Sequence, residues 1–204
     1  MTHTDTLIGI AFTVLGYLSG SVPYGLVLPL LLVGVDVRTV GSGNIGATNA
    51  ARAGGKALGV AVFVLDVAKA VVPLLVARAV LGEAGNFWVM ATAVAAFAGH
   101  LFPVWLRFKG GKGVATAFGI FVVFSPWAAL AGLGAYLLVY AVTRVSSIGS
   151  LSGTLACVVG VIVHQGIGSP VAWAAISIGA MIWWRHRENI RRILSGEEKR
   201  KMKV

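Results

Sequence analysis

Long apolar segments, separated by short polar stretches, are the feature that most constrains what this chain can fold into. A helix that spans a bilayer needs about 20 consecutive, mostly apolar residues. Seven segments of the 204-residue chain are candidates, at about 7–33, 57–81, 88–106, 114–124, 127–143, 148–163 and 171–184. Together they would use about 140 residues, so no second soluble domain of ordinary size fits. We expect an all-α integral membrane protein with seven transmembrane helices, a single membrane domain over residues 1–204 that ends in a basic tail, residues 185–204.

Charged residues make up only 12% of the chain, and the net charge is +10. In a chain this apolar, Lys and Arg indicate topology rather than nucleic-acid binding. In the seven-helix arrangement, all of them except Arg78 fall on one side of the membrane. Positive loops face the cytoplasm, which predicts the N-terminus outside and the C-terminus inside. The one cysteine, Cys157, excludes an intramolecular disulfide and a cysteine-rich metal site, and we expect no metal.

Two features qualify the helix assignment. Pro23, within SGSVPYG at 19–25, predicts a break in the first segment. Segment 114–124 is short, so it either begins within the glycine-lysine cluster before it or forms one broken helix with 127–143.

Asp66 and Lys69 lie three apart on one face of the second helix. Both a structural ion pair and a supporting role at a site remain open for them.

The first polar cluster, GSGNIGATNA at 41–50, lies in a predicted loop over 36–56. Glycine-rich backbone can approach a ligand closely and turn its N–H groups toward an anion. Neutral donors and one fixed cation accompany it: Ser42, Asn44, Thr48, Asn49 and Arg52. We interpret the cluster as half of a phosphate site at the membrane surface. A polar loop that only joins two membrane helices is the alternative.

Two further clusters fall on the same predicted cytoplasmic face. In GHLFPVWLRFKGGKGVAT at 99–116, Lys109 and Lys112 stand among Gly110, Gly111 and Gly113. Lysine beside a glycine-rich turn suits phosphate, although a basic loop that only holds topology looks similar. A lone His such as His100 is more often structural than catalytic. In the tail, helical spacing would place Arg185, His186, Asn189 and Arg192 on one face.

Several familiar motifs are excluded. GSGNIG at 41–46 matches G-x-G-x-x-G, but a membrane helix precedes it instead of the strand that a Rossmann unit needs. GGKG at 110–113 lacks the spacing and the Ser or Thr of a P-loop, which argues against ATP hydrolysis. The chain has no HExxH and no paired carboxylates near this face. The residues alone therefore predict a site for a phosphorylated small molecule at the lipid surface.

Taken together, the clusters resemble the bacterial acyl-phosphate–glycerol-3-phosphate acyltransferase family. The likeness rests on GSGNIGATN at 41–49, GHLFP and FKGGKGVAT within 99–116, and RHRENIRR at 185–192, with SGSVPYG, LDVAK at 65–69 and the serines of 145–150 in support. It implies a seven-helix fold in the bacterial cytoplasmic (inner) membrane with a cytoplasmic active site. It also implies transfer of an acyl group from a fatty acyl phosphate to the 1-hydroxyl of glycerol 3-phosphate, giving lysophosphatidic acid and inorganic phosphate in phospholipid synthesis, without a cofactor.

The resemblance also assigns site residues. Catalytic roles fall to His186, Ser150 and Asn189. Substrate and phosphate binding falls to Ser42, Gly43, Asn44, Gly46, Thr48, Asn49, Arg52, His100, Lys109, Gly110, Gly111, Lys112 and Gly113. The proton acceptor stays open among His186, His100 and a substrate phosphate oxygen, with substrate assistance favoured. The implied partners are fatty acyl phosphate, glycerol 3-phosphate and membrane lipid, with no nucleic acid, for a chain that can act as a monomer.

Three alternatives compete with this interpretation. A transporter of glycerol 3-phosphate or a similar metabolite would typically show an inverted repeat, and none is convincing here. A membrane scaffold with a lipid-binding tail would leave the neutral donors of the first cluster unexplained. A thioester-dependent acyltransferase would typically carry H-x4-D, and none of the four histidines has Asp five positions on.

Overall fold

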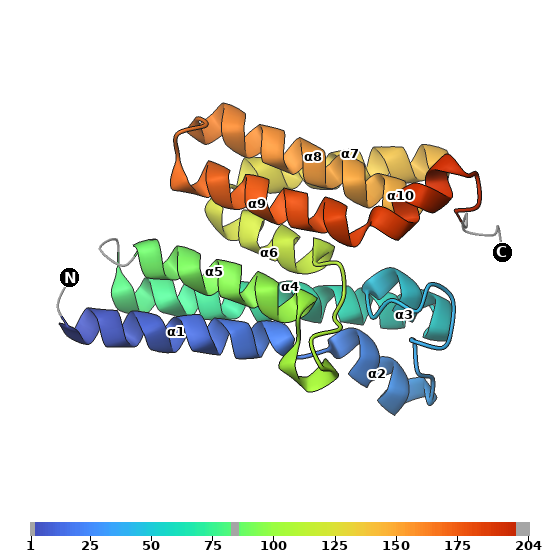
Figure 1. Cartoon of the computed structure of the whole chain (residues 1–204), viewed down its shortest axis with the longest axis horizontal. Helices are drawn as coiled ribbons and strands as arrows, with labels where there is room; N and C mark the ends of the chain where they lie inside the picture. Colours follow the sequence, from blue (N-terminus) through green and yellow to red (C-terminus); the bar gives the residue numbers. More distant parts are fainter. Residues whose placement is uncertain (1–2, 83–85, 199–204) are drawn as a thin grey trace. The chain divides into compact units, whose positions relative to one another are not determined.

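The computed structural model describes residues 3–82 and 86–198, and every regular element within them is a helix (Figure 1). The chain forms two compact units, residues 1–123 and 124–204. Helices of the first unit are α1 (His3–Ser21), α2 (Tyr24–Val33), α3 (Ala47–Gly54), α4 (Lys56–Leu81), α5 (Asn86–Leu101), the 3₁₀ turn η2 (Val104–Leu106) and α6 (Val114–Phe124). The second unit contains α7 (Pro126–Thr143), α8 (Ser146–Gln165), α9 (Pro170–Arg185) and α10 (Arg187–Leu194).

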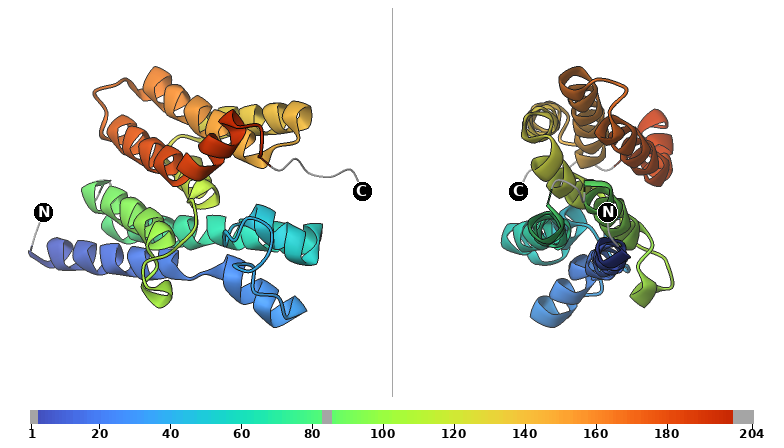
Figure 2. Two further views of the ribbon diagram at one scale, coloured as in Figure 1. Left: turned by 45° about the vertical axis from the view of Figure 1, so that its right-hand side comes forward. Right: turned by 90° about the vertical axis from the view of Figure 1, so that its left-hand side faces the viewer.

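Within the first unit, α1 and α5 lie side by side with their backbones in contact (Figures 1 and 2). A Cβ at Gly16 would lie 2.7 Å from the carbonyl oxygen of Thr92, and a Cβ at Gly20 would overlap the carbonyl of Ala96. From the other side, a Cβ at Gly99 would overlap the Tyr17 carbonyl. Small residues let membrane helices approach closely, and van der Waals packing then replaces the hydrophobic effect that lipid does not supply.

The break predicted at Pro23 is confirmed. Helix α1 ends at Ser21, α2 begins at Tyr24, and the pair is bent by 40°. Proline has no N–H for the helical ladder and its ring displaces the preceding turn. Helix α2 then ends at Gly34, which adopts φ +66° and closes the helix with a hydrogen bond from its N–H to the Pro29 carbonyl.

The prediction that 36–56 is entirely loop is wrong, because α3 occupies Ala47–Gly54. Four alanines among its eight residues, at 47, 50, 51 and 53, favour a helix. Ala50 is buried against Leu58 and Val62 of α4, so tertiary packing stabilises a helix that would be too short to persist alone. Glycines at both ends of this segment favour turns, and in the sequence interpretation that signal outweighed the helix propensity of the alanines between them.

In the part of the chain that the structure describes, four stretches are long and apolar enough to cross a membrane: Lys56–Leu81, Asn86–Leu106, Pro126–Thr143 and Ser146–Gln165. The bent pair α1–α2 makes a fifth if it counts as one span. Helix α6 has 11 residues and α9 has 16, lengths of about 17 Å and 24 Å against a hydrocarbon core of about 30 Å. The all-helical fold is thus confirmed, and seven crossings remain a prediction.

In the second unit, α7 and α8 touch at Gly132 and Gly153, where a Cβ on the first would lie 2.8 Å from the carbonyl of the second. Helices α6 and α7 are separate, because α6 ends at Phe124 and Pro126 opens α7. The short amphipathic helix predicted for the tail is confirmed as α10. The sequence also predicts that the tail ends in a disordered stretch and that Glu83 lies in a short loop, and residues 83–85 and 199–204 lie outside the described residues.

Candidate active site

Asn49 organises the first polar cluster. Its side chain is 1% exposed and makes three hydrogen bonds to the loop that precedes α3. The Nδ2 atom donates to the carbonyls of Val37 at 2.7 Å and Val40 at 3.1 Å, and Oδ1 accepts from the Ser42 amide at 3.0 Å. A buried amide satisfied on both sides rigidifies the backbone around it. Asn49 is therefore buried under the loop and fixes its shape, and its side chain is not exposed to a ligand.

Gly41 is a position at which this loop requires glycine. Its φ is +59°, a conformation that is strained for residues with a side chain. A Cβ there would also overlap Oδ1 of Asn49 and would lie 3.3 Å from Cδ of Arg52. The loop thus folds tightly over the amide of Asn49 and beside the stem of Arg52.

The open side of the same loop carries the polar groups suited to an anion. Ser42, Thr48 and Arg52 are exposed, and Asn44 is half-buried. Helix α3 begins directly after the loop, with Gly46 at its N-cap and no side chain capping it. The N-terminus of a helix carries partial positive charge and N–H groups that favour anions. Hydroxyls, helix terminus and guanidinium together can bind a phosphate.

Arg38, in the preceding turn, forms an ion pair with Asp36. Its Nε lies 2.9 Å and 3.1 Å from the two carboxylate oxygens, and its NH2 lies 2.6 Å from one of them. The side-chain hydrogen bonds from Arg38 hold the pKa of Asp36 below its ordinary value. The Asp36 carboxylate offsets the positive charge of Arg38 at close range, so we assign the anion contact of this cluster to Arg52.

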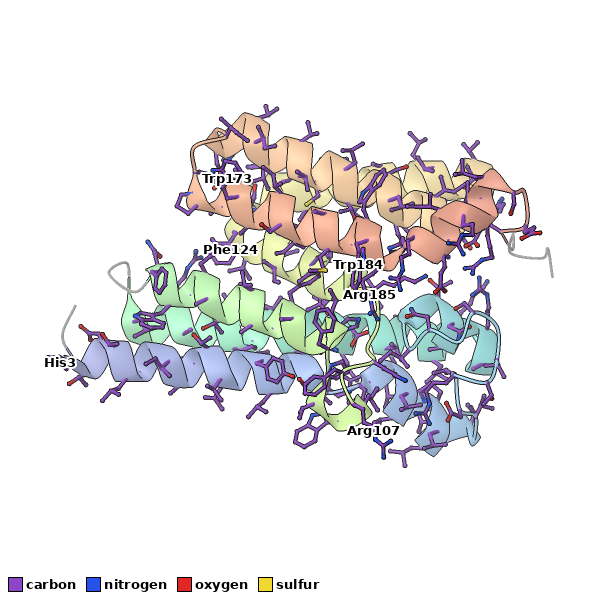
Figure 3. All side chains as sticks on the ribbon, viewed as in Figure 1. His3, Arg107, Phe124, Trp173, Trp184 and Arg185 are labelled. Atoms are coloured by element: carbon purple, nitrogen blue, oxygen red, sulfur yellow. The ribbon has the colours of Figure 1, made fainter. Side chains whose placement is uncertain are left out.

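The glycine-lysine cluster folds back onto the end of α5. The amides of Gly110 and Gly111 donate to the carbonyls of Leu101 at 3.1 Å and His100 at 3.2 Å. Arg107 and Phe108, at φ +50° and +62°, reverse the chain beyond η2. Figure 3 shows Arg107 at the outer edge of this turn. Of the two lysines, Lys109 is exposed, whereas Lys112 is half-buried within the turn.

His100 lies inside the first unit, beneath this cluster. The residue is 4% exposed, and a Cβ at Gly111 would overlap its ring at Nε2. On the other side of the ring, Nδ1 lies 3.8 Å from Oδ1 of Asp66, which in turn lies 2.8 Å from Nζ of Lys69. The structure therefore brings His100 against the backbone of the loop and to a buried ion pair.

In the second unit, Glu198 gathers three donors. Its Oε1 accepts from Ser147 Oγ at 2.7 Å and from Asn189 Nδ2 at 2.6 Å, and its Oε2 accepts from Arg192 Nε at 2.7 Å. Burial alone would raise the pKa of Glu198, but these hydrogen bonds and the charge of Arg192 hold that pKa below its ordinary value. The carboxylate thereby ties α10 to the start of α8.

His186 and Ser150 lie in the same unit. His186 is 3% exposed, and its Nδ1 lies 2.8 Å from the carbonyl oxygen of Ile182. A carbonyl only accepts, so the proton of the neutral ring belongs on Nδ1 and Nε2 is the acceptor. Ser150 is 8% exposed and its carbonyl accepts from Thr154 Oγ1 at 2.7 Å.

The predicted binding residues of both loop clusters belong to the first unit, and the predicted catalytic residues belong to the second. The sequence interpretation assigned no role to Ser147 or Glu198. Ser147 stands three residues before Ser150 in a serine-bearing stretch that was singled out. Glu198 lies near the end of the basic tail, and no periodicity in the sequence marks an acceptor there.

These features define the class: a helical protein with helices long and apolar enough to cross a membrane, and with polar loops that carry neutral donors and cations. The family model described as glycerol-3-phosphate acyltransferase matches residues 10–196, and the chain belongs to that family. It is a membrane acyltransferase, as the resemblance predicted.

Relatives named glycerol-3-phosphate acyltransferase agree over nearly their whole length. The protein of Anaeromyxobacter dehalogenans (strain 2CP-1 / ATCC BAA-258) is 62% identical over 196 residues, which are 95% of this chain and 98% of the relative. The protein of Myxococcus xanthus (strain DK1622) is 46% identical over 190 residues, 93% of this chain and 98% of the relative.

Two solved structures share the fold. Both are of PlsY (YgiH), described as an integral membrane glycerol 3-phosphate acyltransferase. The glycerol 3-phosphate form has a TM-score of 0.89 at 42% identity, covering 95% of this chain and 96% of that one. The lysophosphatidic acid form has a TM-score of 0.85 at 41% identity, covering 95% of each.

Proposed function

We propose that this protein transfers the acyl group of a fatty acyl phosphate to the 1-hydroxyl of glycerol 3-phosphate. The bond between the acyl carbon and the phosphate oxygen breaks, and an ester bond to the glycerol oxygen forms. The hydroxyl proton passes to phosphate oxygen, so the products are 1-acyl-sn-glycerol 3-phosphate and inorganic phosphate. Phosphate is already a good leaving group, and the reaction needs neither a covalent enzyme intermediate nor a cofactor.

The observation that carries the proposal is the loop held by Asn49. Ser42 and Thr48 are exposed around the N-terminus of α3, and Arg52, in the last turn of α3, is exposed with its stem beside Gly41 of the loop. Two phosphate groups must be held close together, which requires backbone N–H groups, hydroxyls and fixed cations. The relatives support the acceptor and the product, because PlsY was captured in glycerol 3-phosphate and lysophosphatidic acid forms. Absence of H-x4-D supports an acyl phosphate donor over a thioester.

Roles follow for the remaining predicted residues. In the first loop, Gly43, Asn44 and Gly46 keep the backbone close to the phosphate. In the second cluster, Lys112 binds phosphate with Lys109 nearby, and Gly110, Gly111 and Gly113 shape the backbone. His186 orients substrate through Nε2, with Ser150 and Asn189 as further donors, while a substrate phosphate oxygen takes the hydroxyl proton. Positioning and charge stabilisation then supply most of the acceleration.

For topology, we propose seven crossings in the bacterial inner membrane, with the N-terminus outside and the polar clusters on the cytoplasmic face. The chain's single cysteine makes the test direct. In a Cys157→Ala background, single cysteines at Thr39 and at Ser195 should react with an impermeant maleimide only in inside-out vesicles. Labelling of either one in intact spheroplasts would overturn the orientation.

The decisive experiment for the activity uses purified protein in lipid with labelled glycerol 3-phosphate. Palmitoyl phosphate, palmitoyl-CoA and palmitoyl carrier protein are supplied one at a time. We expect lysophosphatidic acid from the acyl phosphate alone. Product only from a thioester would overturn the donor, and glycerol 3-phosphate binding without product from any donor would favour a transporter.

A further inference from the structure

Three buried polar side chains of the first unit stand apart from the exposed donors of the loops. Asp66, Lys69 and His100 are 2%, 5% and 4% exposed. Lys69 Nζ lies 2.8 Å and His100 Nδ1 lies 3.8 Å from the same Asp66 oxygen. An apolar set of similar size is often as stable as a buried ion pair, because desolvation offsets the attraction. Stability alone therefore does not account for this cluster.

Lys69 has a structural task at the break between α1 and α2. Its Nζ donates to the carbonyl of Val22 at 3.0 Å, and its own carbonyl accepts from Ser19 Oγ at 2.8 Å. The break leaves carbonyls outside the helical ladder, and in a membrane each must find a donor. Asp66 balances the positive charge of Lys69, but this balance does not explain why His100 lies beside the pair.

His100 links the ion pair to the glycine-lysine loop. Its Nδ1 edge faces Asp66, and its Nε2 edge meets the backbone of Gly111 so closely that a Cβ there would overlap the ring. A Cβ at Gly110 would overlap the His100 carbonyl. The imidazole ring therefore lies directly against the backbone at Gly111, and Lys112 is the next residue.

We infer that Asp66 is a positioning residue, which orients the His100 ring and through it the backbone at 110–113 and the placement of Lys112. A separation of 3.8 Å is longer than a hydrogen bond, so Asp66 acts on the ring by charge in an interior that screens little. The effect on substrate rests on the proposed phosphate-binding role of this loop. The effect on the loop itself does not.

The test measures the loop and the reaction separately. Hydrogen–deuterium exchange of the peptide 107–114 reports the Gly110 and Gly111 amides, and KM for glycerol 3-phosphate reports Lys112. In Asp66→Asn and in His100→Gln we expect exchange about tenfold faster. We expect KM to rise on the order of tenfold or more, with a smaller change in kcat. Thr92→Val should leave both unchanged, because Thr92 is another fully buried polar residue of α5, eight residues before His100, and its hydroxyl donates to the Trp88 carbonyl.

A double-mutant cycle separates positioning from stability. If Asp66 acts through His100, Asp66→Asn adds nothing to either readout in the His100→Gln background. The Asp66→Asn/Lys69→Gln variant removes both charges, keeps an N–H donor for the Val22 carbonyl and guards against failure to fold. It should unfold near the wild-type temperature while exchange and KM stay altered. Wild-type exchange in that double variant, or unchanged exchange in Asp66→Asn, would overturn the inference. Faster exchange with unchanged KM would uphold it and remove the loop from substrate binding.

Discussion

The side-chain amide of Asn189 donates to the carboxylate of Glu198 at 2.6 Å. An amide group is planar, so fixing its nitrogen also fixes the direction of its oxygen. Ser147 shares the same carboxylate oxygen at 2.7 Å, which anchors it to α8. A residue beyond the last helix therefore sets the orientation of a side chain to which we assign a role in catalysis.

Glu198→Gln should weaken this arrangement in a pH-dependent way. The pKa of Glu198 is held below its ordinary value. Its stabilising contribution is therefore complete above that ordinary value and is lost as pH falls through the lowered one. At neutral pH we expect the variant to lose about 1 kcal/mol, since the pair stays partly in contact with water. Thermal unfolding across the acidic range checks this, and an equal gap between the two proteins at every pH would contradict it.

Asn49→Ala should loosen the first loop from within. The change leaves the Val37 and Val40 carbonyls and the Ser42 amide without their partner. We expect a loss of about 2 kcal/mol in unfolding free energy and a higher KM for glycerol 3-phosphate. Asn49→Asp is the matched variant, because it keeps the acceptor for Ser42 and loses both donations. Wild-type KM in the alanine variant would show that the loop's shape does not matter to substrate.

Arg52→Ala should affect binding without affecting the fold. Arg52 is exposed, so truncation leaves thermal unfolding close to wild type. Losing a charge-assisted contact to phosphate costs about 1.5–3 kcal/mol, or about 10- to 100-fold in KM. Arg52→Lys should recover part of the loss, because lysine keeps the charge but not the bidentate geometry. Steady-state kinetics with palmitoyl phosphate held in excess gives the values, and equal KM in all three proteins would exclude Arg52 from the site.

Gly113→Ala and Gly34→Ala form a matched pair. Both glycines have positive φ, +82° and +66°, so each alanine variant incurs about 1–2 kcal/mol of backbone strain. At Gly34 nothing lies within 4 Å of the new methyl, whereas at Gly113 it would overlap the ring of Phe97. We expect the larger fall in melting temperature for Gly113→Ala, together with lost activity. Equal falls would mean that the loop can retreat from α5.

His186→Asn and His186→Gln separate the two ring nitrogens. Asparagine can replace the Nδ1 donation to Ile182, whereas glutamine places its amide near the position of Nε2. If His186 only orients substrate, Asn should fold normally and keep measurable turnover with the wild-type pH profile. Loss of all turnover at unchanged glycerol 3-phosphate affinity would make His186 the general base and end the substrate-assisted scheme. His100→Ala provides the same comparison for the other candidate histidine.

Much of the architecture follows from hydropathy and proline. The bounds of α4 and α7, Lys56–Leu81 and Pro126–Thr143, lie within about a residue of the predicted segments because glycine or proline marks their ends. Helix α3 escaped prediction because its stability comes from packing on α4. Contacts between residues far apart in the sequence cannot be predicted from their spacing either, because no spacing rule connects Asp66 with His100, or Ser147 with Glu198.

The sequence predicted which residue types make up the candidate site, but not which of them are exposed to a ligand and which hold the backbone in place. Residue types in the first cluster indicated phosphate, and Ser42, Thr48 and Arg52 are indeed exposed. Asn49 and His100 belong to the same motifs, yet they are buried and hold backbone in place. A polar side chain in a motif can face the ligand or face the loop, and only burial distinguishes the two.

The glycine seam between α1 and α5 also bears on how this protein is made. Gly16 and Gly20 match Thr92 and Ala96 at backbone distance, so the two helices recognise each other by shape once both are in the bilayer. Such a fit needs no connecting chain. Helices α1 and α2 should then dock even when they are synthesised as a separate polypeptide, so the loop that follows Gly34 is a natural place to divide the enzyme between two complementing genes.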